Sequence, residues 1–279
     1  IGQEDYYSMY EYDYYTMRNP KMYVTFYDIT NINSPVLKDF YEFEGYYKTA
    51  RMSEEYAYII STQNIDGGVS PLPIITKNNQ ESSIMSDDMY YLPYPHTYAQ
   101  LVGVYSFELD TNNLVDKKIL TVDQLQDVYV SSNAIYLAGY QYISEYDISQ
   151  EVLMELVYKK LSLEDKELIE SIKSVDTAIL SYYEKQAKIL QVHYAYLSSL
   201  SGEEQEEYQD RIEAETYKKI KDLDYLEYTL LTKIDYSNGD LTIKETTRVP
   251  GRINNQFSLD EYEGVLRVAT TISRTWSQY

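Results

Sequence analysis

The 279-residue chain contains no cysteine, and this absence excludes disulfide bonds, thiol nucleophiles and thiolate metal sites together. Basic residues are also scarce, because 24 Lys and Arg stand against 45 Asp and Glu, for a formal net charge of −21. Binding of nucleic acid rests on clustered cations that neutralise phosphates, so we do not expect a nucleic-acid partner. Apolar runs stay short of the ~18 residues that a membrane span requires, so no membrane span is expected.

Histidine and glycine motifs are equally sparse. His96 and His193 are the only histidines, which is too few for a histidine-based zinc site. No Gly-x-Ser-x-Gly sequence accompanies them, so the sequence does not indicate a Ser-His-Asp centre. Gly67-Gly68 is the only glycine pair, and it lacks the Lys-Ser or Lys-Thr of a phosphate-binding loop. We therefore predict no catalytic residues and no cofactor-binding residues.

Tyrosine is abundant, with 35 Tyr against 5 Phe and one Trp. Tyr favours strands and tolerates a half-wet face, because its ring packs while its hydroxyl reaches water. The composition predicts a surface-rich β protein that uses Tyr where others use Phe, Val or Ile. An adhesive or carbohydrate-stacking surface is the alternative interpretation.

Short strand patterns, separated by turn residues at intervals of ~10 residues, cover most of the chain. The predicted strands are residues 22–27, 36–43, 46–50, 56–61, 98–109, 114–121, 128–131, 134–138, 142–146, 226–236, 241–247 and 265–271. Asn238-Gly239 supplies the positive φ angles of a two-residue turn, which predicts a tight hairpin between the strands on either side. Residues 1–19 are expected to form a loop or a sheet edge, and residues 62–97 one long polar loop.

The apolar period becomes helical after Ile148. Ser162-Leu163-Glu164-Asp165 and Ser201-Gly202-Glu203-Glu204 resemble capping boxes, and apolar residues follow each at spacings of three or four. Residues 150–227 are therefore predicted to form two or three helices, as an antiparallel hairpin or small bundle. Residues 1–149 and 228–279 are predicted to belong to one β domain that continues on both sides of this insertion.

The segment Val249–Thr271 resembles a signature of a secreted β-propeller family that is distantly related to WD-repeat proteins and occurs in archaea and some bacteria. Two further regions are similar to the same family in the same order, within residues 28–52 and 128–137. The resemblance implies a mainly β fold, an incomplete or fragmentary β-propeller with an α-helical insertion. The signature residues, which we expect to be structural, are Pro250, Gly251, Asn255, Gln256, Phe257, Asp260, Glu261 and Arg267.

The resemblance also implies a larger ring than this chain supplies. A blade takes ~40 to 50 residues, so the ~200 residues outside the insertion predict about four blades. We therefore expect a fragment or processed product, with protein partners or the remainder of its own chain completing the propeller. An extracellular or cell-surface location follows from the resemblance alone. The function expected is a non-enzymatic structural or binding module of a cell-surface assembly.

Carboxylates supply the alternatives to this function. A carbohydrate-active enzyme would need two acids that flank one bond, yet Asp260 and Glu261 are adjacent on a strand and point to opposite faces. Arg267 is predicted to pair with one of them. Calcium is the most plausible ion, with Asp110, Asn112 and Asp116 as weak candidates, but they lack the spacing of an EF-hand loop, which favours a solvated turn. A glycan binder that uses exposed Tyr is the other alternative.

Overall fold

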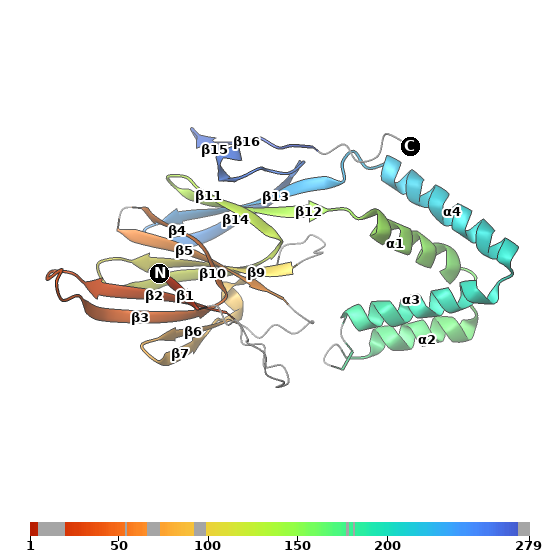
Figure 1. Ribbon diagram of the computed structural model, residues 1–279, viewed down its shortest axis with the longest axis horizontal. Coiled ribbons are helices and arrows are strands. Elements are labelled where there is room, and N and C mark those ends of the chain that lie inside the picture. The colour runs from red at the N-terminus through yellow and green to blue at the C-terminus, as the bar shows by residue number, and fades with distance from the viewer. Residues whose placement is uncertain are drawn as a thin grey trace. The chain divides into compact units, whose positions relative to one another are not determined.

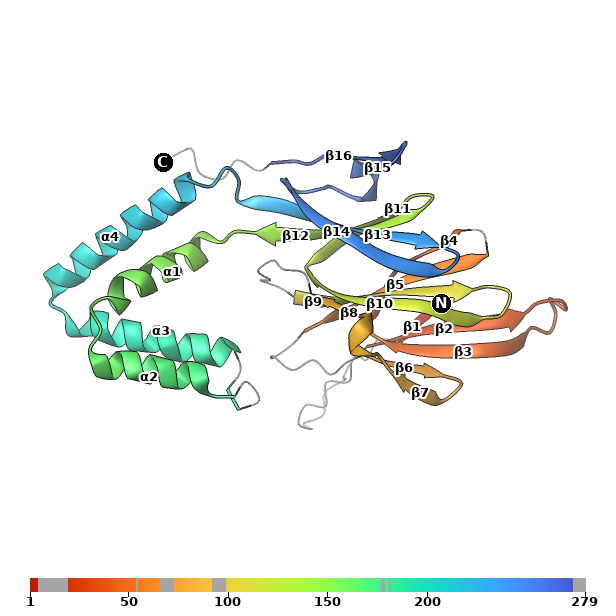
Figure 2. The same cartoon turned by 180° about the vertical axis from the view of Figure 1, so that it is seen from behind.

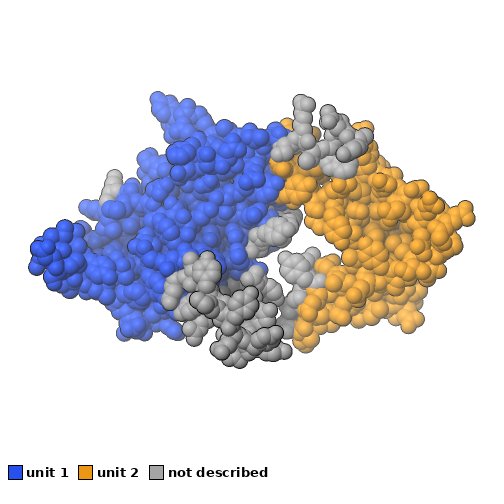
Figure 3. Space-filling view, viewed as in Figure 1, with its two compact units in different colours: residues 1–65, 71–141, 228–273 blue, residues 66–70, 142–227, 274–279 orange. Residues whose placement is uncertain are grey.

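A computed structural model describes residues 1–4, 20–53, 55–65, 73–91, 99–176, 179–180 and 182–272. The chain divides into two compact units, coloured separately in Figure 3. The first, here called the β unit, comprises residues 1–65, 71–141 and 228–273. The second, here called the helical unit, has its described residues within 142–227.

The described residues of the β unit form four sheets (Figure 1). The first has the order β1-β2-β3-β6-β7, the second β4-β5-β9-β10-β8, the third β11-β12-β13-β14, and the last is the hairpin β15-β16. Neighbours pair antiparallel except β8 and β10, which run parallel. The strands are Gly2–Glu4 (β1), Lys21–Asp28 (β2), Val36–Glu44 (β3), Tyr46–Ser53 (β4), Tyr56–Asn64 (β5), Ile74–Lys77 (β6), Gln80–Ser83 (β7), Met89–Tyr91 (β8), Ala99–Glu108 (β9), Asn113–Asp123 (β10), Leu125–Val130 (β11), Ala134–Tyr142 (β12), Glu227–Ser237 (β13), Asp240–Pro250 (β14), Leu259–Tyr262 (β15) and Val265–Val268 (β16).

The middle strands β5 and β9 of the second sheet are buried on both faces, which explains their continuous apolar runs. On β5, Tyr58 and Ile60 pack with residues of the third sheet, while Ile59 packs with residues of the first. Successive side chains of a strand point to opposite faces, so each run of neighbouring apolar residues supplies two cores. The hairpin β15-β16 packs in turn on the third sheet through Leu259. Sheets stacked face to face in this way are the arrangement expected of propeller blades, although the four described sheets form no closed ring.

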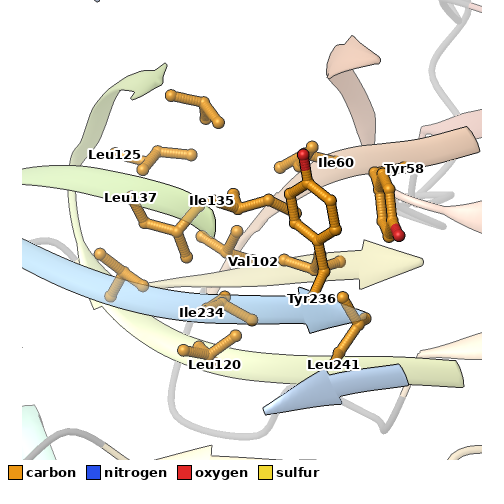
Figure 4. Packing of buried hydrophobic residues seen from close by; sticks show 13 residues of the cluster. Tyr58, Ile60, Val102, Leu120, Leu125, Ile135, Leu137, Ile234, Tyr236 and Leu241 are labelled. Atoms are coloured by element: carbon orange, nitrogen blue, oxygen red, sulfur yellow. The ribbon is translucent and has the colours of Figure 1, made fainter. Parts of the chain in front are cut away.

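Several tyrosines lie inside these cores rather than on a half-wet surface. Tyr58 and Tyr236 face each other between the second and third sheets, with ring centroids 4.3 Å apart (Figure 4). The Tyr236 hydroxyl donates to the Ser131 carbonyl oxygen at 2.7 Å, and the Tyr41 hydroxyl donates to that of Asn112 at 2.9 Å. Buried tyrosine is tolerated when its hydroxyl has such a partner. The abundance of Tyr thus serves the interior as well as the surface.

The predicted turn at Asn238-Gly239 is confirmed. Ser237 pairs with Asp240 across it, and the two central residues have φ of 50° and 84°. The prediction of one loop over residues 62–97 is wrong in its described part, because β6 and β7 form a second hairpin there. Its turn is Asn78-Asn79, with φ of 47° and 66°. Asn adopts the left-handed conformation through its short polar side chain, so a pair without glycine makes the same kind of turn.

The helical unit contains four helices in its described residues, seen from the other side in Figure 2. These are α1 (Glu145–Tyr158), α2 (Leu163–Ser174), α3 (Tyr182–Ser199) and α4 (Gly202–Lys221). Both predicted capping sites start helices: Ser162 and Ser201 accept hydrogen bonds from the amides of Asp165 and Glu204. The four helices share a core of their own, built around Val152, Ile189 and other aliphatic residues.

The prediction of a strand over 142–146 and of a helical segment from residue 150 is wrong at this boundary. β12 ends at Tyr142, and α1 begins at Glu145 behind the cap residue Ser144, whose hydroxyl accepts from the Asp147 amide. The alternating tyrosines around this point mimic a strand, while the single serine that stops it is easily overlooked. The Ile143 amide donates to the Leu226 carbonyl at 2.8 Å, so the two ends of the helical unit are hydrogen-bonded together.

In the described parts of the chain, no helix has the length and apolar character needed to cross a membrane.

Candidate functional site

The segment from Pro250 to Thr271 is closed into a loop at its base. The amide of Arg252 donates to the Thr271 carbonyl at 2.9 Å, and the Thr271 amide donates back to that of Arg252 at 2.8 Å. Gly251 precedes this bridge with φ of 84°, and a Cβ there would lie 2.7 Å from the Thr271 oxygen. Only glycine fits such a conformation against a neighbouring backbone.

Two threonine hydroxyls fix the Pro-Gly turn from either side. The buried Thr229 on β13 donates through Oγ1 to the Gly251 carbonyl at 2.8 Å. Thr270 donates through Oγ1 to the Pro250 carbonyl at 2.7 Å. Because buried or crowded carbonyls need partners, these bonds hold β14 and the strands after it in one arrangement. The signature residues Pro250 and Gly251 are thus held in place by hydrogen bonds to their carbonyl oxygens.

The short 3-10 helix Gln256–Ser258 follows, and two amides of the signature position it. The Asn255 side chain accepts from the Phe257 amide at 2.9 Å, which caps the turn. The Gln256 Oε1 accepts from Arg51 Nη2 on β4 at 3.2 Å, so the second sheet contacts this turn directly. The side chain between them, Phe257, is 86% exposed.

The two acids of the signature lie on opposite faces of β15. Asp260 pairs with Arg267 across the hairpin, and both side chains are more than half exposed. Glu261 instead faces the third sheet, where its Oε2 accepts from the Tyr136 hydroxyl at 2.9 Å. Burial, and then the adjoining Glu261 carboxylate, raise the pKa of the Tyr136 phenol above its usual range. The arrangement does not place these two carboxylates about one bond.

Sequence reasoning did not identify the exposed apolar residues of this hairpin, which lie beside the Asp260–Arg267 pair, with Arg267 5.4 Å from the centre of the Tyr262 ring. Tyr262 is 60% and Val265 63% exposed, and they pair with each other next to the β-turn Glu263-Gly264. Phe257 lies in the same signature, immediately before β15. Large apolar residues concentrated on one small element are unusual on a free surface and mark contact sites. A signal was available in the sequence, because phenylalanine is rare in this chain and one of five stands here.

Two of the three calcium candidates, Asn112 and Asp116, are engaged in hydrogen bonds of the fold. Asp116 accepts from the Lys118 ammonium and from the Leu241 amide, each at 2.8 Å. Asn112 donates through Nδ2 to Asp39 at 3.1 Å, while Asp110 lies exposed in the turn between β9 and β10. Among the described residues, no three His, Asp or Glu side chains gather closely enough to hold a metal ion.

The two histidines lie in different settings. His193 is on α3, buried in the helical unit, with Nδ1 2.8 Å from the Ile189 carbonyl oxygen. His96 lies outside the described residues.

Comparison with known proteins agrees with the stacked sheets and the signature. An uncharacterized protein of Archaeoglobus fulgidus is 29% identical over 242 residues, which cover 83% of this chain and 37% of the relative. An uncharacterized protein of Methanocaldococcus jannaschii is 24% identical over 262 residues, covering 89% of this chain and 39% of the relative. The chain thus spans less than half the length of these curated relatives. No solved structure matches it. A family model described as "Beta propeller domain" matches residues 1–279 throughout, and the chain belongs to this family.

Proposed function

We propose that this chain is part of a non-enzymatic β-propeller that serves outside the cytoplasm as a structural or binding module of a cell-surface assembly. The observation that carries the proposal is the exposure of three large apolar side chains on and next to the last hairpin, Phe257, Tyr262 and Val265, each more than half exposed. A protein surface that covers these side chains is the simplest means of removing them from water. Blades from the remainder of the same polypeptide or from a partner would do so.

In the described structure no third strand pairs with the hairpin, although the Glu261 amide of β15 donates to the Tyr129 hydroxyl at 3.0 Å. β15 and β16 form a sheet of two strands, whereas the other three sheets of the described structure have four or five. Open edges and apolar faces invite pairing with further β structure, and propellers normally protect them by closing the ring. The location outside the cytoplasm is the part of the proposal that rests on the resemblance to a secreted family.

A photo-crosslinking amino acid in place of Phe257 tests this function in the intact protein of the cells that make it. The proposal requires an efficient crosslink, either within the polypeptide, if its own blades cover residue 257, or to a partner chain. The same amino acid in place of Thr242, an exposed polar residue of β14, is the matched control and should crosslink poorly. A face at residue 257 that crosslinks to no protein would contradict the proposal.

The location is tested separately by adding a protease to the intact cells. Cleavage of the protein without cell lysis is expected, with a cytoplasmic protein of the same cells as the protected control.

Carbohydrate chemistry is the alternative that the same protein can test. The exposed tyrosines of the β unit, Tyr27 and Tyr262 among them, offer rings on which sugars could stack. Hydrolysis of a glycan that disappears when one acid is replaced would favour an enzyme over a scaffold. Glycan binding without hydrolysis, lost on replacing exposed tyrosines, would favour the glycan binder.

A further inference from the structure

A groove of about 500 Å³ lies within the helical unit, where α1, α2 and α3 meet. Its apolar wall is formed by Met154 and Tyr158 from α1, Ile169 from α2, and Ile189 and His193 from α3. Residues four apart on a helix share one face, so each helix turns an aliphatic or aromatic stripe toward the groove. The size and lining are those of a site for a small molecule with an apolar body.

His193 gives this wall a single polar atom with no partner. The ring is 2% exposed and stacks against Tyr158, with centroids 6.4 Å apart and planes inclined by 26°. Its Nδ1 lies 2.8 Å from the Ile189 carbonyl oxygen, which can only accept, so Nδ1 carries the hydrogen. In the neutral ring Nε2 is then an acceptor, and no group in the described chain donates to it. Nε2 has almost no accessible surface, so a ligand hydroxyl or N–H would satisfy it once a neighbouring side chain of the groove moves aside.

The polar rim of the groove carries an excess of positive charge in a chain of net charge −21. Lys159 and Lys173 line it beside one acid, Glu155. Glu155 already accepts from Lys219 at 3.0 Å, and Lys173 pairs with Glu170 at 2.8 Å in an exposed pair. Lys159 has no ion pair with any described residue, which leaves its ammonium available to an anion. The rim thus complements a carboxylate rather than an amine.

We propose that this groove binds a small aromatic carboxylate that also carries a hydroxyl or N–H donor. The aromatic body packs between Met154, Ile169 and Ile189, the donor bonds His193 Nε2, and the carboxylate pairs with Lys159. This site is independent of the propeller function proposed above, because all of its residues belong to the helical unit.

The probe is 3-(4-hydroxyphenyl)propionate, titrated into the full 279-residue chain labelled with ¹⁵N and followed by NMR of the histidine ring nitrogens. The free protein should show hydrogen on Nδ1 of His193. The probe should shift the Nε2 signal of His193, while His96, the only other histidine, serves as the internal control. Two analogues separate the contacts: 3-phenylpropionate lacks the donor, and 4-hydroxyphenethylamine replaces the carboxylate with a cation. Each should bind at least about tenfold more weakly, because each leaves one buried or charged group unpaired.

Two substitutions assign the contacts to residues. His193→Leu keeps an apolar side chain but removes the acceptor, and should abolish the advantage of the hydroxylated probe over 3-phenylpropionate. Lys159→Gln should weaken binding of both carboxylates about three- to tenfold, whereas Lys188→Gln, on the exposed face of α3, should leave binding unchanged. Equal affinity for the two carboxylates in the wild-type protein, or no response of His193 to millimolar probe, overturns the proposal without requiring that either variant fold.

Discussion

Gly251 and Gly264 show how one backbone conformation can have different costs in different surroundings. Their φ angles are 84° and 76°, but a Cβ at Gly251 would lie 2.7 Å from a backbone oxygen, whereas one at Gly264 would meet nothing within 4 Å. We expect Gly264→Ala to destabilise the β unit by about 1 kcal/mol, the cost of the left-handed conformation alone. Gly251→Ala adds a backbone overlap and should cost about 3 kcal/mol.

Denaturant unfolding followed by near-ultraviolet circular dichroism measures both changes. Gly202→Ala is a further control, because that residue begins α4 with open space around it and Ala favours helix. Equal destabilisation by the substitutions at 251 and 264 would show that the close approach of a Cβ to the Thr271 oxygen adds no cost in stability.

Tyr105 makes the stability of the β unit depend on alkaline pH. Burial, only partly offset by a hydrogen bond with Ser61, raises the pKa of its phenol to about 12. In the unfolded chain the group ionises near pH 10, so between about pH 10 and about pH 12 only the unfolded state loses the proton. Stability therefore falls as pH rises through this window, by about 1.4 kcal/mol per pH unit for this group. Below pH 10 its contribution is present in full.

Tyr105→Phe keeps the ring but removes the ionising hydroxyl. Between about pH 10 and about pH 12 the free energy of unfolding of this variant should fall less steeply than that of the wild type, by about 1.4 kcal/mol per pH unit. Denaturant unfolding at several pH values measures both slopes. Tyr27→Phe, at an exposed position, is the matched control and should leave the slope unchanged. If both variants give the wild-type slope, Tyr105 ionises in the folded protein as it does in water.

At the scale of elements, the structure followed sequence signals where these were local and complete. Asn238-Gly239 carries its own turn geometry, and Ser201 with Glu204 its own helix cap, so both were predictable. Asn78-Asn79 adopts the same left-handed conformation without a glycine, so the turn pattern did not predict the hairpin β6-β7. The start of α1 was hidden by tyrosines whose spacing suits a strand. In each case the deciding interaction involves one side chain, which a pattern of apolar residues does not contain.

The helical unit should be removable. Its core is formed by its own helices, and its two ends are joined by the hydrogen bond between Ile143 and Leu226. We expect replacement of residues 144–225 by a short turn sequence to remove the helical circular dichroism and leave the β signal. The complementary piece, residues 142–227, should be helical alone. Loss of all β structure from the shortened protein would show that the β unit depends on the helices.

At the scale of the whole molecule, the family and the mainly β architecture were predictable from the signature, while the surface that we propose to be functional was not. The predicted pairing of Arg267 with one of the two acids is confirmed, because Arg267 lies opposite Asp260 across the hairpin and pairs with it. The exposure of Phe257 could not be predicted, because it depends on how a three-residue helical turn is held between Asn255 and Arg51. Sequence patterns report which residues are apolar, not which apolar residues the fold leaves uncovered.

The exposed side chains of Phe257, Tyr262 and Val265 should govern the association of the 32.8 kDa chain in solution. We expect the isolated chain to self-associate at high concentration through the face of Phe257, and Phe257→Asp to shift the native mass toward the monomer, measured by light scattering. Thr242→Asp introduces the same charge at an exposed polar residue of β14 and should have little effect. A strictly monomeric wild-type chain would indicate that this face is stable in water without a cover.

The bond between Ile143 and Leu226 also bears on the order of folding. β12 and β13 are neighbours in the third sheet, yet residues 143 to 226, 84 in all, separate them along the chain. Bringing the ends of so long a flexible segment together costs about 3 kcal/mol more in chain entropy than closing an ordinary hairpin. Helices form from local contacts and assemble fast, so a helical unit that folds first shortens the effective separation to a few residues. The strand pair with the largest sequence separation in this sheet would then close at the speed of a local hairpin.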